Sequence, residues 1–151
     1  MVVVDDEDMV LTSVRAFLSL ETEYEIQTFL EPERAVEFLR NNLAEVIVSD
    51  YLMPGMTGIQ FLARARELQP EAPRVLLTGH ADKQSAIEAI NQVGLFHYLE
   101  KPWDNEQLLL IVNNAIERAS LFRELKEKIA ELSTANSSLK AVQARLLKAF
   151  L

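Results

Sequence analysis

The chain has 151 residues, of which 49% are hydrophobic and 25% charged, the composition of one ordered domain with a short appendage. It has no cysteine, which excludes disulfides, thiolate metal sites and a cysteine nucleophile. No stretch resembles a signal peptide or reaches the roughly 18 apolar residues of a membrane span, so we expect a cytoplasmic protein without membrane contact. The net charge of −8 argues against direct nucleic-acid binding, because the carboxylates would repel phosphates.

Charge is distributed unevenly along the chain. Residues 1–120 contain 9 basic and 20 acidic side chains, whereas residues 121–151 contain 6 basic and 3 acidic ones. The hydrophobic pattern also changes period near residue 120. We therefore interpret residues 1–120 as a globular domain and residues 121–151 as a helical extension that leads to a domain outside this chain.

Five short apolar runs alternate with helical periodicity in the first hundred residues. The runs cover residues 1–4, 25–30, 46–49, 74–77 and 96–99. Within them, residues 2–4, 46–48 and 75–77 are continuously apolar, as expected for strands covered by helices on both faces, and the more polar second run is expected near an edge. The alternation predicts an α/β fold with a doubly wound, mostly parallel sheet of five strands and five helices.

Helix signals follow several of these runs. Val10, Val14 and Phe17 form one apolar stripe after Asp8, which we expect to cap the first helix. The spacing of Asp104 and Gln107 matches a capping box at the start of the fifth helix. Because neither glycine nor proline follows, this helix is predicted to run on toward the end of the chain.

A seven-residue repeat occupies the C-terminal region. Its two apolar heptad positions include Phe122, Leu125, Ile129, Leu132, Asn136, Leu139 and Leu146, with Gln143 and Phe150 continuing the pattern. Such a repeat is typical of a coiled-coil seam, and the asparagine favours two parallel strands, hence a homodimer. The alternative is one amphipathic helix that docks on a domain outside this chain.

Polar side chains come directly after four of the predicted strands. Asp5 and Asp6 follow the first strand, Asp50 the third, Thr78 the fourth and Lys101 the fifth. Because parallel strands end at the same edge of an open sheet, where ligands bind, we expect these side chains to meet there.

Clustered carboxylates without histidine or cysteine ligands favour a hard cation such as Mg²⁺. A carboxylate beside a metal and an ammonium group is suited to accept a phosphoryl group as an acyl phosphate. Asp50 is the best candidate acceptor, because Asp5 and Asp6 are adjacent and better placed as metal or water ligands. Thr78 could donate a hydrogen bond to a phosphoryl oxygen.

The four segments that carry these residues resemble the receiver domain of two-component response regulators, over about residues 1–118. They are residues 3–7 (VVDDE), 49–58 (SDYLMPGMTG), 77–82 (LTGHAD) and 98–103 (YLEKPW). The resemblance implies a flavodoxin-like sheet of order 2-1-3-4-5, and a sensor histidine kinase as the source of the phosphoryl group on Asp50. Mg²⁺ would bind Asp6, Asp50 and the carbonyl of Leu52 directly, and Asp5 through water.

The resemblance also implies a switch. Thr78 and Lys101 would contact the phosphoryl oxygens, Lys101-Pro102 would be a cis peptide, and the ring of Tyr98 would move as Thr78 shifts. The signal would pass through the fifth helix and the dimeric coiled coil to an output domain. The chain is also similar to receivers that precede cyclic-dinucleotide phosphodiesterase domains or the ATPase domains of hydrogenase regulators.

Three other functions are alternatives to a phosphorylation switch. A constitutive dimerisation scaffold could keep the receiver fold without the switch. A small Mg²⁺-dependent phosphatase would place an acid two residues after Asp50, where this chain has Leu52, and a flavin carrier would need a phosphate-binding loop after the first strand. We therefore expect no enzyme activity beyond the chain's own phosphorylation and dephosphorylation.

Overall fold

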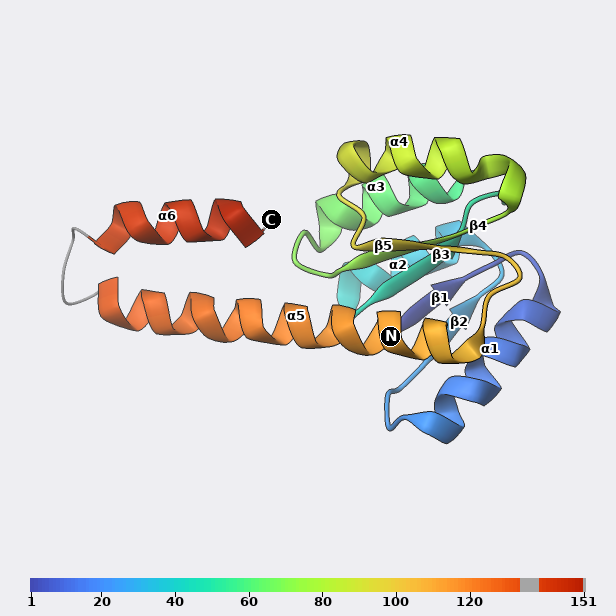
Figure 1. The fold of residues 1–151 in the computed structure, drawn as a ribbon, viewed down its shortest axis with the longest axis horizontal. Helices are drawn as coiled ribbons and strands as arrows, with labels where there is room; N and C mark the ends of the chain where they lie inside the picture. Colours follow the sequence, from blue (N-terminus) through green and yellow to red (C-terminus); the bar gives the residue numbers. More distant parts are fainter. Residues whose placement is uncertain (134–138, 151) are drawn as a thin grey trace.

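The computed structural model describes residues 1–133 and 139–150. Five parallel strands form a sheet of order β2-β1-β3-β4-β5, which confirms the predicted topology (Figure 1). The strands are β1 (Val2–Val4), β2 (Gln27–Phe29), β3 (Ile47–Asp50), β4 (Arg74–Thr78) and β5 (His97–Glu100).

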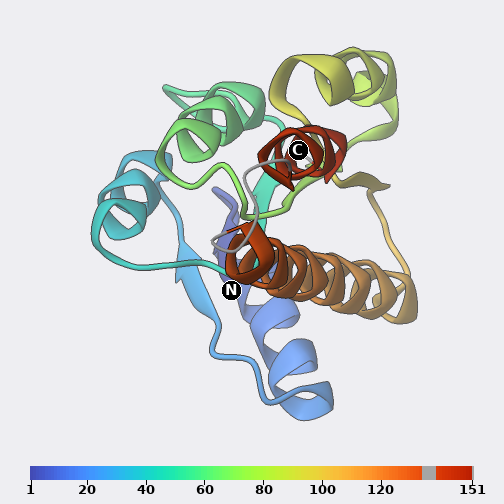
Figure 2. The same ribbon diagram turned by 90° about the vertical axis from the view of Figure 1, so that its left-hand side faces the viewer.

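Helices cover both faces of the sheet (Figures 1 and 2). They are α1 (Asp8–Glu21), α2 (Pro32–Asn41), α3 (Gly58–Leu68), α4 (Lys83–Val93), α5 (Asn105–Ser133) and α6 (Leu139–Phe150), with a 3₁₀ turn, η1 (His80–Asp82). Helices α1 and α5 pack on one face, and α2, α3 and α4 pack on the other. Over residues 1–133 and 139–150, no helix combines the length and apolarity needed to cross a bilayer.

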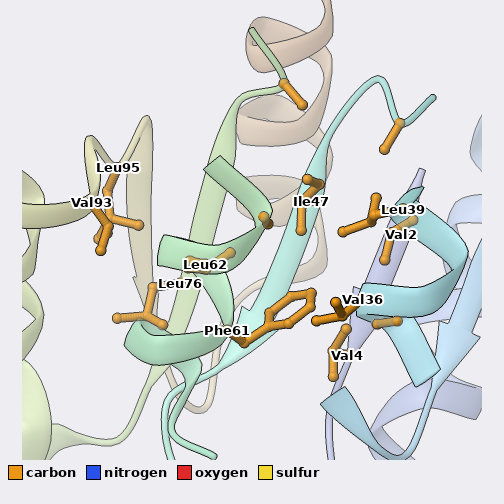
Figure 3. Close-up of a cluster of buried hydrophobic side chains, with 14 of the residues drawn as sticks. Val2, Val4, Val36, Leu39, Ile47, Phe61, Leu62, Leu76, Val93 and Leu95 are labelled. Atoms are coloured by element: carbon orange, nitrogen blue, oxygen red, sulfur yellow. The ribbon is translucent and has the colours of Figure 1, made fainter. Parts of the chain in front are cut away.

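Alternate residues of each strand feed two separate apolar cores. Val2 and Val4 of β1 join Phe61 of α3 in the core beneath α2, α3 and α4 (Figure 3), whereas Val3 points to the core beneath α1 and α5. All three valines are at most 1% exposed. This two-sided burial explains why the strands read as continuous apolar runs.

Strand β2 lies at the edge of the sheet, as predicted from its polar sequence. It covers Gln27–Phe29, which is shorter than the predicted run over residues 25–30, and all three of its residues are half-buried. An edge strand has only one neighbour, so fewer of its residues are held in the hydrogen-bonded ladder.

Two predicted helix caps differ from the structure. Asp8 is the first residue of α1 rather than its cap, and the cap residue Glu7 makes no side-chain capping bond. Instead, the Glu7 backbone N–H donates to Asp5 Oδ1 at 2.9 Å. Asp104 does cap α5, but its Oδ1 accepts from the Glu106 backbone N–H at 2.9 Å, one residue before Gln107.

The C-terminal region has two helices where one was predicted. Helix α5 passes the expected domain boundary at residue 120 without a break and ends at Ser133, and α6 then runs back alongside it (Figure 1). The intervening residues, 134–138, read TANSS. They lie outside the described residues; the prediction of one continuous helix is wrong because α5 and α6 run in opposite directions.

Candidate functional site

Three carboxylates gather at the carboxyl ends of β1 and β3. Asp5 and Asp6 follow β1, and Asp50 is the last residue of β3. One ligand oxygen from each lies within 4.8 Å of the others. Asp5 is fully buried and Asp50 is 6% exposed, while Asp6 faces solvent. The parallel register of β1 and β3 sets this proximity, because it brings both strand ends to the same edge.

Lys101 supplies the positive charge of this site. Its Nζ lies 3.1 Å from Asp5 Oδ2 and 3.0 Å from Asp50 Oδ1, so one ammonium group bridges both buried carboxylates. The residue is held by its backbone, since the Lys101 N–H donates to the Thr78 carbonyl at 2.8 Å. The Lys101-Pro102 peptide is cis, as the sequence resemblance implied.

Thr78 ends β4 at the same edge and is fully buried. Its hydroxyl donates to the Gly79 carbonyl at 3.1 Å. A hydroxyl has one hydrogen to donate, so Thr78 can donate to a new partner in this site only if it gives up the bond to Gly79.

Burial sets the protonation balance of the site. Loss of hydration raises the pKa of Asp5 and of Asp50, and this outweighs the ammonium of Lys101, which acts to lower both. Burial alone would lower the pKa of Lys101, but its hydrogen bonds and charge interactions with Asp50 and Asp5 raise that pKa overall. The site therefore keeps a charged lysine beside carboxylates that burial makes harder to ionise.

The donor set fits a hard divalent cation. When all three carboxylates ionise, the one positive charge of Lys101 leaves the site with an excess of negative charge. Carboxylate oxygens suit Mg²⁺ or Ca²⁺, and an open position such as the one at exposed Asp6 leaves room for the waters that Mg²⁺ retains.

Gly58 packs directly against the end of β3. A Cβ at this position would lie 2.0 Å from the Asp50 carbonyl oxygen, so only glycine allows α3 to begin here. Its N–H donates to the Tyr51 carbonyl at 2.8 Å, which closes the loop after Asp50. The sequence does not reveal this contact, because the steric constraint comes from folding rather than from residue spacing.

The other predicted site residues are found in three settings. Leu52 lies in the loop after β3 with its side chain 58% exposed. Tyr98 on β5 is half-buried and packs against the core beneath α2, α3 and α4. Within the predicted seam, Phe122 is buried, Leu125, Ile129 and Leu146 are half-buried, and Leu132 is exposed; Leu139 begins α6, and Asn136 lies outside the described residues.

Comparison with known proteins agrees with this geometry. The family model of the response regulator receiver domain matches residues 1–113. The hydrogenase transcriptional regulatory protein HoxA of Cupriavidus necator is 32% identical over 138 residues, which are 91% of this chain and 28% of the regulator. The transcriptional regulator NtrC of Escherichia coli is 35% identical over 89 residues, 59% of this chain and 19% of that protein. The chain thus spans less than a third of these two relatives.

Solved structures show the same fold. The receiver domain of an HD domain-containing protein from Pseudomonas fluorescens matches with a TM-score of 0.74 and 30% identity, covering 79% of this chain and 94% of that one. A structure described as an adenylate cyclase from Rhodopirellula baltica matches with a TM-score of 0.80 and 28% identity, covering 85% and 95%. With the acidic cluster, Thr78 and Lys101 at one sheet edge, the chain belongs to the response regulator receiver domain family of two-component signalling.

Proposed function

We propose that Asp50 accepts a phosphoryl group from a sensor histidine kinase. The observation that carries this proposal is the bridge from Lys101 to Asp5 and Asp50 beside the three-carboxylate cluster. A carboxylate attacking phosphorus needs neighbouring positive charge to balance the charge on the transferring group. Lys101 is already within hydrogen-bond distance of Asp50, so its positive charge stands beside the carboxylate that would attack phosphorus.

Mg²⁺ would be held by Asp6, Asp50 and the backbone carbonyl of Leu52, with Asp5 acting through water. When bound, the ion would neutralise charge on the phosphoryl oxygens. Asp6 is the accessible member of the cluster, which suits a direct ligand at the mouth of the site. Asp5 is fully buried and engaged by both Lys101 and the Glu7 N–H, which suits a positioning role.

The switch would begin at Thr78. Its hydroxyl would leave the Gly79 carbonyl and donate to a phosphoryl oxygen, while Lys101 contacts another. Tyr98 lies on the neighbouring strand β5, paired with Leu76 two residues before Thr78, and its ring would move with this strand end. Phosphorylation would act by favouring one of two existing conformations through these contacts.

The output path would run through α5. This helix starts just after Lys101-Pro102 and is capped by Asp104, so its first turn is linked directly to the site. Farther along, the heptad stripe would pair two copies as a coiled coil and lead to an output domain. The length of HoxA and NtrC beyond the matched region supports an output domain in a longer protein. A kinase-regulated module of this kind would work in the cytoplasm.

The test uses beryllofluoride, which mimics a phosphoryl group, together with Mg²⁺. Wild-type protein should show a changed nuclear magnetic resonance environment for the Tyr98 ring, and Asp50→Asn should show none. Thr78→Val, which keeps the shape but lacks the hydroxyl, should bind beryllofluoride with a reduced Tyr98 response. An equal response in wild type and Asp50→Asn would overturn the proposal and favour a constitutive scaffold.

A further inference from the structure

Helix α6 folds back onto its own chain. Figures 1 and 2 show α6 beside α5 and running in the opposite direction, so that its last turn returns to the globular domain. The rings of Phe122 on α5 and Phe150 on α6 lie 5.6 Å apart between centroids. Helix α5 ends at Ser133, and α6, which begins at Leu139, runs antiparallel to it.

The two helices meet through the heptad stripe. On α5, Phe122 is buried, and Ile129 is half-buried two turns later. On α6, the half-buried residues are Gln143, Leu146 and Leu147. Apart from Leu147, these residues occupy the positions that the sequence predicts for a seam between two chains. We call this folded-back arrangement of α5 and α6 the hairpin, and a chain that adopts it the closed chain or closed form. In the closed chain, α6 covers the part of α5 that a second copy would use.

The end of α6 also reaches the globular domain at the edge remote from Asp50. The lining of a cavity of about 140 Å³ includes Pro70, Arg74, Phe96 and Arg118 of the domain side, together with Phe122 and Phe150. The Arg118 guanidinium lies 5.6 Å from the centre of the Phe96 ring, a cation–π distance. The position of α6 thus depends on contacts with the domain as well as with α5.

The α5 extension is tied to this same edge by charge. Lys126 Nζ donates to Glu71 Oε1 in the loop before β4. Both side chains are partly exposed, at 46% and 40%. This pair adds little stability, but it shows which side of α5 faces the domain in the region where α6 returns.

We propose that α6 is an internal competitor for the dimerisation surface of α5. In one continuous helix, Phe122 and Phe150 would be about 42 Å apart, because each residue adds 1.5 Å. In the closed chain their rings touch, so the hairpin and a continuous coiled coil exclude each other. This inference rests on the coiled-coil part of the proposed function, and it adds that the dimer forms only when α6 leaves α5.

The hairpin is an incomplete cover. Leu132 remains 59% exposed and Val142 46% exposed. Starting from the Phe122–Phe150 pair, two turns along each antiparallel helix bring apolar Ile129 level with polar Gln143. A parallel dimer would instead place each residue opposite its own copy, so that isoleucine meets isoleucine. The closed form gains from proximity, because a short linker gives a high effective concentration, and this offsets the poorer match.

A pair of variants separates the two states. Leu147 is half-buried in the hairpin but flanks the seam of a dimer, so Leu147→Gln should open the hairpin and spare the coiled coil. Val142→Gln is the matched control, since Val142 is exposed on the same helix. By analytical ultracentrifugation we expect Leu147→Gln to lower the dimer Kd about fivefold or more, and Val142→Gln to change it less than about twofold. An unchanged or raised Kd for Leu147→Gln would overturn the proposal.

Because the chain has no cysteine, crosslinking gives a second readout. With a short bismaleimide, Phe122→Cys plus Phe150→Cys should crosslink within one chain, and adding Leu147→Gln should shift the product to dimers joined at Cys-substituted position 122. Dimers as the main product without Leu147→Gln would contradict the closed form. If no variant dimerises, the proposed competition is overturned. Phosphorylation of Asp50 is measured separately, and its result tests the proposed function independently of dimerisation.

Discussion

The globular domain and the C-terminal extension both carry regularly spaced apolar residues, but the spacing constrains them differently. In the domain, each strand lies in register with a neighbour, so placing β1 and β3 also places Asp5 and Asp50. In the extension, α6 packs against the apolar stripe of α5, and we propose that a second copy of the chain can pack there instead. The register of a parallel sheet determines both which residues are buried and which strand they lie beside. A heptad repeat determines which residues are buried but not which helix buries them.

The largest expected difference between the regions concerns two lysine–carboxylate pairs. Lys101→Ala removes the partner of fully buried Asp5, so without Mg²⁺ it should lower the free energy of unfolding by about 3 kcal/mol. Lys126→Ala breaks the exposed pair with Glu71 and should cost less than about 1 kcal/mol. Urea denaturation measures both. Equal losses of unfolding free energy in the two variants would contradict this prediction, because the buried pair would then contribute no more stability than the exposed one.

Mg²⁺ should stabilise the domain through the carboxylate cluster. At a concentration one hundred times its Kd, a ligand specific for the folded state adds about 2.7 kcal/mol to the free energy of unfolding. Asp6→Asn should remove most of that gain, whereas Asp8→Asn, an exposed carboxylate outside the cluster, should keep it. Thermal melts with Mg²⁺ and with EDTA provide the comparison. A full metal response in Asp6→Asn would contradict the assigned ligand.

Gly58 tests how tightly the loop after Asp50 is fitted. Gly58→Ala brings a methyl group to 2.0 Å from the Asp50 carbonyl oxygen, so the backbone must move, at a cost of about 1–3 kcal/mol. Phosphorylation should also slow, because the acceptor strand moves with it. At Gly79 the nearest atom is 3.5 Å away, so Gly79→Ala is the control for an ordinary contact. Similar stabilities and phosphorylation rates for the two variants would show that the close approach is relieved without cost.

A smaller effect should appear in the pH dependence without metal. Burial raises the pKa of Asp50 in the folded state, so the folded protein binds this proton more readily than the unfolded chain. Wild type should therefore gain stability as the pH falls from about 7 toward the ordinary carboxyl range. Asp50→Asn should be more stable than wild type near neutrality, and this advantage should shrink with acidification. An advantage independent of pH would rule out titration of Asp50 as its source.

Sequence patterns predicted most of the domain because its signals are local and its topology is constrained. The valine runs mark the central strands, and the predicted strand ends place Asp5, Asp50, Thr78 and Lys101 at one edge of the sheet, where the structure has them. The close approach of Gly58 to the Asp50 backbone was not predictable, because it arises between segments that only folding brings together.

Two further features were beyond sequence reasoning. Arg74 reads as an ordinary strand residue, yet it is 7% exposed, and its guanidinium donates to the carbonyls of Val93, Pro70, Ala72 and Gly94. Burial lowers its pKa to about 10. The antiparallel packing of α6 on α5 is not evident from the sequence. The heptad pattern continues from one helix to the next, and no glycine or proline separates them.

The most direct test of the central claim is phosphorylation of Asp50 itself. Wild-type protein is incubated with acetyl phosphate and Mg²⁺, and the intact mass is recorded beside that of Asp50→Asn. We expect wild type to gain one phosphoryl group only when Mg²⁺ is present, and Asp50→Asn to gain none. Equal labelling of the two proteins, or labelling of wild type that persists in EDTA, would contradict the account.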